Sequence, residues 1–202
     1  MTDARLARPL PLPANVDPDR VVCEWYDLIR PRGDRLRLLW TARDATGDEP
    51  VLAMVGINPS SAGDQASDRT CANFWAIAQR HGWRRVLILN LFSAPATEPP
   101  DLLGYSGRPG YGRYVAEELR AVVAAGGRAV AAWGALSGSI PPESAYAGRS
   151  GELRALLRER RDEVLREVGS AVPWWCLGRT EDGSPRHPSR LGHDVRMEPW
   201  TP

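Results

Sequence analysis

Residues 51–75 of this 202-residue chain read VLAMVGINPSSAGDQASDRTCANFW and decide the fold that we expect. Residues 51–55 are all apolar, which is the pattern of a strand buried on both faces. A loop of small and polar residues follows, and a helical pattern begins near Arg69. Open α/β sheets bind ligands at such loops, because backbone N–H groups are free where a strand leads into a helix. The stretch therefore predicts an α/β fold with Asn58 in a pocket, although these residues also fit an ordinary turn.

The composition fits one globular domain. Hydrophobic residues make up 43% and charged residues 25% of the chain, whose length suits one α/β domain better than two. We expect an extended arm at 1–20, rich in Pro and Arg, and a single α/β domain over 21–202. The net charge is +1, so any contact with nucleic acid must come from a local patch. All 26 basic residues are Arg, which suits phosphate recognition but is better explained by GC-rich codon usage.

The sequence indicates no metal and no other cofactor. Cys23, Cys71 and Cys176 are far apart, form no CxxC pair and cannot supply the four ligands of an iron–sulfur cluster. No apolar segment reaches the roughly 18 residues that a membrane span needs, and the amino terminus lacks the apolar core of a signal peptide. We therefore expect a cytoplasmic protein with neither a metal nor a membrane partner.

Strand and helix patterns alternate along the chain. Two strand patterns, at 21–26 and 36–41, flank a turn and predict a β-hairpin before the main sheet. The later strands are expected at 51–55, 86–91, 129–133 and 172–177, and the helices at 70–81, 113–125 and 151–169. The charged pairs of the last helix indicate a solvated face. This alternation predicts a three-layer α/β sandwich around a mostly parallel sheet of about four strands.

Two further polar residues follow predicted strands. Asn90 ends the strand at 86–91, where it can form the floor of a pocket or hold the following loop together. His187 lies beyond the last strand, on the edge where Asn58 should emerge. By contrast, His81 at a helix end and His193 in the tail are expected to be structural or solvated.

Two separated motifs resemble those of the uracil-DNA glycosylase superfamily, most closely its mismatch-specific uracil and thymine glycosylase branch. In that branch Gly-Ile-Asn-Pro leads through a Ser/Gly-rich loop into Asn-Arg-Phe-Trp, and a later His-Pro-Ser is followed after one residue by Leu. The corresponding residues here are Gly56, Ile57, Asn58 and Pro59, then Asn73, Phe74 and Trp75, and finally His187, Ser189, Arg190 and Leu191. The resemblance implies a glycosylase-like fold in which His187 contacts an extracted base and Leu191 fills the vacated stack.

The order of motifs is also similar to that of the domain-of-unknown-function 1643 family. That family combines Asn-Pro-Ser, a spaced Asp-to-Thr segment, Asn-Leu-Phe with Ala-Thr, Ala-Trp-Gly and Gly-x-Pro-Arg-His-Pro. All are present, and the resemblance covers roughly residues 35–192. It identifies relatives and does not identify an activity.

The chemistry of base–sugar cleavage assigns roles to these residues. The catalytic candidates are Asn58, which can orient a water but cannot take its proton, Asp68 and His187. A stronger base would have to be Asp64 or Asp68, and either could instead be the amino-terminal cap of the next helix; for Asp68 the two roles fit equally well. His187 can donate a hydrogen bond to a pyrimidine oxygen, and Phe74 or Trp75 can stack on a base. The other candidates for substrate binding are Gly56, Ile57, Pro59, Ser60, Asp64, Asn73, Asn90, Ser189, Arg190 and Leu191.

Three functions are consistent with this set of residues. The leading hypothesis is hydrolysis of a base–sugar bond in DNA by a protein of the uracil-DNA-glycosylase type. A second hypothesis changes the substrate to a free nucleotide or nucleoside, which the near-neutral charge favours. A third is a non-catalytic nucleobase- or nucleotide-binding protein, because Asn58 replaces the acid that catalysis usually employs.

Overall fold

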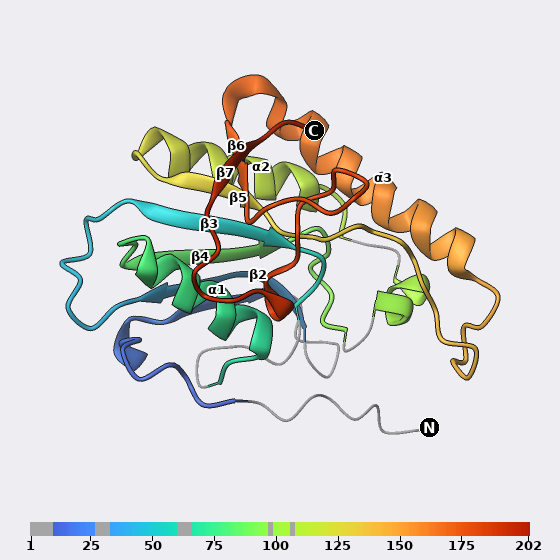
Figure 1. Cartoon of the computed structure of the whole chain (residues 1–202), viewed down its shortest axis with the longest axis horizontal. Coiled ribbons are helices and arrows are strands. Elements are labelled where there is room, and N and C mark those ends of the chain that lie inside the picture. Colours follow the sequence, from blue (N-terminus) through green and yellow to red (C-terminus); the bar gives the residue numbers. More distant parts are fainter. Residues whose placement is uncertain (1–9, 27–32, 60–65, 97–98, 106–107) are drawn as a thin grey trace.

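The computed structural model describes residues 10–26, 33–59, 66–96, 99–105 and 108–202. It is a mixed α/β fold with one seven-stranded sheet in the order β1-β2-β4-β3-β5-β6-β7 (Figure 1). The strands are β1 (Val22–Tyr26), β2 (Asp34–Thr41), β3 (Val51–Gly56), β4 (Arg85–Asn90), β5 (Arg128–Ala131), β6 (Trp174–Cys176) and β7 (Glu198–Trp200). The helices are α1 (Arg69–Arg80), α2 (Tyr111–Ala124) and α3 (Ser150–Val168), with the short 3-10 helices η1 (Pro18–Arg20), η2 (Pro99–Gly104), η3 (Gly169–Ala171) and η4 (Pro188–Arg190).

The centre of the sheet is parallel and its edges are antiparallel. The strands β4, β3, β5 and β6 run in parallel, while β2 joins β4 and β7 joins β6 in antiparallel pairs. The expectation of about four strands is therefore wrong for the whole sheet. It is too low because the predicted hairpin, which forms as β1 and β2, is part of the same sheet, and because the tail adds β7.

Helices cover both faces of the sheet. Figure 1 shows α1 on one face and α2 and α3 on the other, which gives three layers. The α1 face contains Phe74 and Ile77, both fully buried together with Leu52 of β3. The other face contains Leu119 of α2 and Leu157 of α3. Each such side chain contributes on the order of 2 kcal/mol through burial, so the apolar stripes of the helices hold the layers together.

Helix α1 begins at a side-chain cap and ends at a glycine. The Asp68 carboxylate accepts a hydrogen bond from the Cys71 backbone N–H, with an Oδ1–N distance of 2.8 Å. The chain leaves the helix through Gly82, whose φ of 80° is a left-handed conformation that glycine adopts without strain. The predicted capping role of Asp68 is thus confirmed, and the cap fixes the first turn of α1 beside the end of β3.

The amino-terminal residues 10–20 lie against the domain. Leu10 pairs with Ser67 and Val16 with Ala42 in isolated antiparallel bridges, and Val16 is buried. None of the helices in the described ranges is both long and apolar enough to cross a membrane.

The strand order creates a crevice at the carboxyl edge of the sheet. The chain leaves β3 towards α1 on one face, and it leaves the neighbouring strand β5 towards α3 on the other face. Adjacent loops that diverge in this way open a crevice between them, which is where open α/β sheets bind ligands. The fold therefore places the loops after β3 and β5 on either side of a potential site.

Candidate functional site

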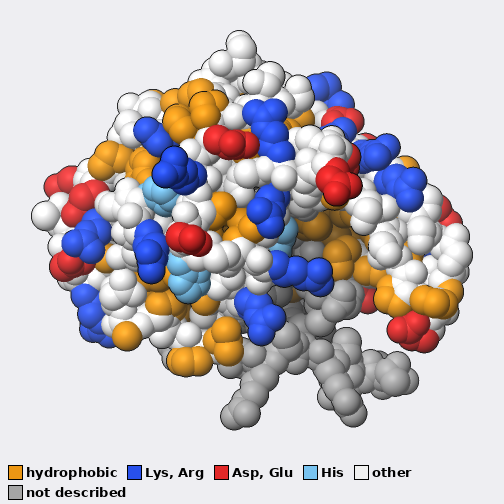
Figure 2. All heavy atoms as spheres, in the orientation of Figure 1, with side chains coloured by type: hydrophobic (Ala, Val, Ile, Leu, Met, Phe, Trp, Pro, Cys, Tyr) orange, Lys and Arg blue, Asp and Glu red, His pale blue; other side chains and the backbone are white. Residues whose placement is uncertain are grey.

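A cavity of about 640 Å³ occupies this crevice. Its size lies within the range of small-molecule sites. Figure 2 shows a hollow on this face with Arg side chains at its rim and hydrophobic side chains inside. Nine of the residues that the sequence singled out line the cavity, namely Gly56, Ile57, Asn58, Asp68, Asn90, His187, Ser189, Arg190 and Leu191.

Asn58 is held so that its oxygen is the atom it can offer to a ligand. Its Nδ2 donates to the carbonyl oxygens of Pro59 and Ala96, at 2.9 and 2.6 Å. Both amide N–H groups are therefore used to join the loop after β3 to the loop after β4. An Asn whose donors are occupied acts only as an acceptor, so Asn58 can receive a hydrogen bond from a water or a ligand N–H.

Asn90 also holds the loop after β3 in place. Its side chain is 4% exposed, and its amide nitrogen faces the carbonyl oxygens of Leu89 and Asn58, at 3.2 and 3.3 Å, in the orientation that satisfies both. A Cβ at Gly56 would lie 2.9 Å from this amide, so a side chain there would displace it. Asn90 thus both lines the cavity and holds the loop together, and the two alternatives drawn from the sequence coexist.

Asp68 and Cys71 line the cavity at the first turn of α1. One oxygen of the Asp68 carboxylate is engaged in the cap described above. Burial raises the pKa of the Cys71 thiol well above its usual range, and the nearby Asp68 carboxylate raises it further. Cys71 is therefore protonated at neutral pH and is not a nucleophile.

His187 lines the cavity, and its hydrogen bonds define which ring nitrogen carries the proton. It caps η4, and its Nδ1 accepts from the backbone N–H of Ser189 at 3.3 Å and lies 2.9 Å from the Ser189 hydroxyl. Burial lowers the pKa of the imidazole below its ordinary value of 6.5, with Asp68 opposing and Arg190 reinforcing the shift. The ring is therefore neutral at physiological pH. Because Nδ1 is the acceptor, Nε2 carries the proton and can donate to a ligand.

The two sequence motifs meet through Asn73. Its Nδ2 donates to the carbonyl oxygens of Pro188 and Leu191, at 3.1 and 3.4 Å, which fastens the η4 segment to α1. Asn73 does not line the cavity itself, so its contacts indicate a positioning role. The segment of His187 is in this way held at the same cavity as Asn58, although the two residues are 129 positions apart in the sequence.

A comparison with protein families identifies the relatives of the chain. The family model described as "Protein of unknown function (DUF1643)" matches residues 36–189. The chain belongs to the DUF1643 family. No match was found among the curated proteins or among the solved structures. The part that matches the DUF1643 model includes the cavity residues described here other than Arg35, Arg190 and Leu191.

Other candidate residues of this DUF1643 protein lie outside the cavity. Phe74 and Trp75 are 0% and 2% exposed and pack in the core, where Trp75 meets Trp40 edge to face. Trp75 Nε1 donates to Asn15 at 2.8 Å. Neither ring can stack on a base in the cavity, because both are buried between α1 and the sheet. Pro59 is also buried away from the cavity lining, and Ser60 and Asp64 lie outside the described residues.

Arg35 is a cavity residue that the sequence patterns do not indicate. It is 2% exposed and lies at the carboxyl edge of the sheet. Strict alternation along β2 would put it on the same face as Arg37. However, Glu24 pairs with Arg37 and Trp25 pairs with Arg35, so Leu36 is an extra residue in a β-bulge. The bulge resets the alternation and puts Arg35 on the α1 face, next to the cavity.

The loop after β5 forms a second wall that a sequence signal could have revealed. Trp133, Gly134 and the residues up to Ser139 line the cavity. Leu136, which is 5% exposed, has a φ of 46°, a conformation that costs a side chain such as Leu free energy. The Gly- and Ser-rich run directly after a buried strand is the same pattern that identified Asn58. Its position at the switch point of the sheet could have marked it as part of the site.

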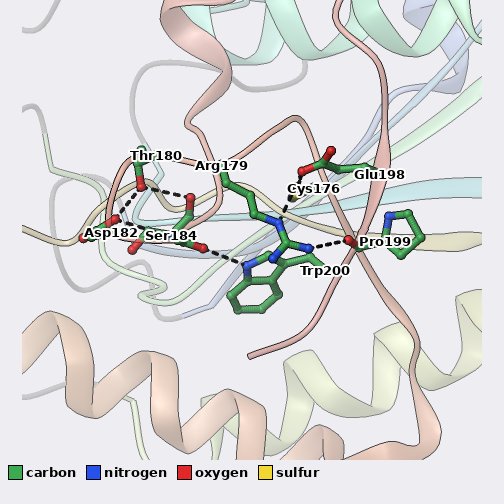
Figure 3. A network of polar contacts seen from close by, with 9 residues as sticks. Cys176, Arg179, Thr180, Asp182, Ser184, Glu198, Pro199 and Trp200 are labelled. Carbon is green, nitrogen blue, oxygen red and sulfur yellow. Dashed lines mark hydrogen bonds and ion pairs between the residues drawn. The ribbon is translucent and has the colours of Figure 1, made fainter.

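A polar network holds the loop after β6, which also contributes Thr180 and Arg186 to the cavity (Figure 3). Arg179 contacts the Glu198 carboxylate at 3.3 Å and donates to the Pro199 carbonyl at 3.0 Å. Within the loop, the Thr180 hydroxyl donates to the Ser184 carbonyl at 3.0 Å. These contacts tie the loop to β7, so the tail strand supports the segment that leads to His187.

The described residues contain no group of three or more His, Cys, Asp or Glu side chains arranged to hold a metal ion. Cys23, Cys71 and Cys176 form no disulfide among the described residues.

Proposed function

We propose that the cavity binds a nucleobase together with its sugar and that the protein hydrolyses the N-glycosidic bond between them. The observation that carries this proposal is the convergence of an amide oxygen, a carboxylate and a neutral imidazole on one cavity, from Asn58, Asp68 and His187. These groups suit a planar heterocycle that carries both N–H donors and carbonyl acceptors at its edge.

The wall of the cavity also suits a heterocycle. Met54, Ile88, Trp133 and Leu157 provide an apolar surface next to the polar groups. A ligand site with mostly apolar walls and a few fixed polar groups gains affinity from burial and specificity from the hydrogen bonds. The fixed acceptor of Asn58 and the fixed donor of His187 are the groups that would select the base.

The reaction requires stabilisation of charge on both sides of the bond that breaks. Water adds to the anomeric carbon of the sugar, the carbon–nitrogen bond breaks, and its electron pair leaves with the base. His187 Nε2–H donates to a carbonyl oxygen of the base and stabilises the developing anion. Asn58 orients the water, and Asp68 accepts its proton before the base is protonated. A neutral histidine suits this role, because the lowered pKa keeps the ring uncharged at neutral pH, while the hydrogen bond that Nδ1 accepts from Ser189 leaves the proton on Nε2.

The resemblance to the uracil-DNA glycosylase superfamily supports base–sugar chemistry and a sandwich fold of that type. A duplex substrate would need a wedge residue, for which Leu191 is the counterpart. Leu191 is 8% exposed and packs in the α1 cluster, so it would have to leave the core to act as a wedge. For this reason we place free nucleosides and nucleotides before DNA as substrates.

The direct test is release of free base. Purified protein is incubated with nucleosides, nucleotides and oligonucleotides that contain mismatched or modified pyrimidines, in single and double strands, and products are separated by chromatography. We expect cleavage that is lost by about 100-fold or more in His187→Gln and in Asp68→Asn. His81→Gln serves as the matched control, since His81 contacts Val195 on the surface. Absence of base release from every substrate would contradict the proposed hydrolysis.

A non-catalytic nucleobase-binding protein is the second candidate. It is favoured because an amide stands at position 58 and because Asp68 already serves as a helix cap. In that case calorimetry would detect nucleoside binding that Asn58→Ala and His187→Gln weaken, with no base released by the wild-type protein.

A further inference from the structure

The amino-terminal segment reaches the candidate site through one residue. The backbone N–H of Leu10 donates to the Ser67 carbonyl at 2.8 Å, and the Ser67 N–H donates to the Leu10 carbonyl at 2.7 Å. Ser67 directly precedes Asp68, which lines the cavity and is the proposed acceptor of the proton from water. Residues 10–16 lie outside the part of the chain that matches the DUF1643 model. A segment outside that part thus pairs with the neighbour of the proposed proton acceptor.

Ser67 depends on this pairing because it is fully buried. Its exposed fraction is 0%, and backbone N–H and C=O groups at that depth need hydrogen-bond partners. Leu10 provides a partner for both groups. The Ser67 hydroxyl in turn donates to the Asp68 carbonyl at 3.1 Å. Loss of the pairing would leave two backbone groups of Ser67 unsatisfied, so the backbone before Asp68 would have to move or admit water.

A second contact point fixes the other end of the segment. The Asn15 side chain accepts a hydrogen bond from Trp75 Nε1 of α1 at 2.8 Å. Val16, the next residue, is buried in the hydrophobic cluster on the α1 face of the sheet. We call residues 10–16 the strap, because the segment is attached to the domain at both ends.

The sequence of the strap makes it stiff. Pro11 and Pro13 lie between the two attached ends. Each proline ring holds φ at about −65°, and Pro-rich segments act as semi-rigid spacers. A stiff segment loses less conformational entropy when its ends are held. The attachment at Asn15 therefore helps to keep Leu10 in register with Ser67.

We propose that the strap positions Asp68 for proton transfer, with Leu10 as the positioning residue that acts through Ser67. The inference rests on the proposed function for the role of Asp68. The place of the carboxylate in the cavity follows the backbone at 67–68, because Oδ1 is held by the Cys71 N–H at 2.8 Å. Proton transfer depends steeply on geometry, and a displacement of about 1 Å can slow a reaction by about 100-fold.

The test removes one hydrogen bond of the pairing. Leu10→Pro lacks the N–H that reaches Ser67, whereas Leu10→Ala, the matched control, keeps both backbone bonds. Leu10 is 43% exposed, so neither change disturbs the core. Base release is measured at a series of substrate concentrations. We expect Leu10→Pro to lower kcat by roughly 10-fold with KM nearly unchanged, because the proton acceptor is displaced while the ligand contacts remain. Leu10→Ala should keep the kcat of the wild type.

A double-mutant comparison shows whether the strap acts through Asp68. In the Asp68→Asn background the carboxylate is absent, so Leu10→Pro should lower the residual kcat no further. A purely structural role would lower kcat by the same factor in both backgrounds, and that result would overturn the proposal. A wild-type kcat in Leu10→Pro would overturn it as well and would leave the proposed function standing.

Hydrogen exchange tests the strap without any turnover. The Cys71 amide is hydrogen-bonded to Asp68, so its exchange rate reports how firmly the carboxylate is held. We expect exchange at Cys71 to be about 10-fold faster in Leu10→Pro than in Leu10→Ala, with the Ile77 amide further along α1 unchanged. If the wild-type protein releases no base, the proposed function fails. Faster exchange at Cys71 then still supports the strap, and equal exchange in the two variants contradicts it.

Discussion

Residues 56–75 consist of a loop half, which ends at Asp68, and a helix half, which begins at Arg69. The described residues of the two halves lie in different environments. Asn58 and Asp68 line the cavity and offer polar atoms to it. Phe74 and Trp75, only two turns further along, are buried in the core between α1 and the sheet. One short stretch of sequence thus provides both a part of the candidate site and a part of the hydrophobic core.

The difference follows from the direction of α1. The helix starts at the carboxyl edge of the sheet, so its first turn reaches the cavity while its later turns pass over the sheet. Residues at helical spacing after that turn must pack inward, as Phe74, Ile77 and Ala78 do. An aromatic residue near a ligand loop is therefore a site candidate only if its turn of the helix lies at the edge.

The largest effect on stability is expected from a substitution in the helix half. Phe74→Ala removes a fully buried ring, and we expect the free energy of unfolding to fall by about 3–5 kcal/mol. Chemical denaturation measures this loss, and calorimetry on the folded fraction should find ligand affinity unchanged. Trp75→Phe, which keeps a six-membered ring but loses the hydrogen bond to Asn15 and part of the buried ring system, is the milder control at about 1–3 kcal/mol. A variant at Phe74 that keeps its stability but loses affinity would show that the ring contacts the ligand.

Two variants of Asp68 distinguish its role as a helix cap from a role in catalysis. Asn caps helices about as well as Asp, so Asp68→Asn should change stability by only a few tenths of a kcal/mol while turnover falls by about 100-fold. Asp68→Ala should in addition lose about 1 kcal/mol of stability, because Cys71 N–H loses its acceptor. Denaturation curves and initial rates are compared for the two variants. Full turnover in Asp68→Asn would restrict Asp68 to the helix cap.

The pKa of His187 predicts a smaller, pH-dependent effect. Its pKa is below 6.5 in the folded protein and near that value in the unfolded chain. The unfolded state therefore binds the proton first, and the folded protein loses stability as the pH falls below about 6.5. Above that pH His187 is neutral in both the folded and the unfolded state, so it does not make stability depend on pH. His187→Gln should remove this component. Denaturation at a series of pH values from 8 to 5 should then show a shallower decline in the free energy of unfolding for the variant than for the wild type. A steeper decline in the variant would contradict the sign of the pKa shift.

The smallest effect is expected at the network of Figure 3. The side chains of Arg179 and Glu198 are 47% and 48% exposed, and such ion pairs contribute about 0–1 kcal/mol. Glu198→Gln should therefore unfold almost like the wild type at moderate salt. If the network positions the loop of His187, the variant should raise KM while leaving kcat nearly unchanged; an unchanged KM would limit the network to local structure.

The order of elements could be predicted from the sequence because apolar runs and helical stripes repeat with clear periods. The strands at 51–55 and 86–91 and the helix at 70–81 have the boundaries of β3, β4 and α1 to within one or two residues. The tail strand β7 could not, since Glu198 and Pro199 have no alternation and are held mainly by pairing with β6. Strands of this length are specified by their neighbour and not by their own sequence.

The candidate site was predictable where chemistry and position coincide. Asn58 and His187 follow buried strands, and parallel strands end at a common edge, so their approach follows from the topology. The position of Arg35 could not be predicted in this way, because a one-residue bulge reverses the face of the sheet that alternation assigns to it. A bulge depends on how β1 pairs with β2, and the pattern of one strand cannot reveal it.

The central claim is that Asn58, Asp68 and His187 together bind a nucleobase. The most direct measurement is the NMR spectrum of the imidazole nitrogens during titration with the nucleoside 5′-monophosphates, since the chain has 3 histidines and the other two serve as internal references. We predict that the His187 signals shift with the binding curve, with Nε2 protonated throughout, while those of His81 and His193 stay in place. Binding that leaves the His187 signals unchanged would contradict the account.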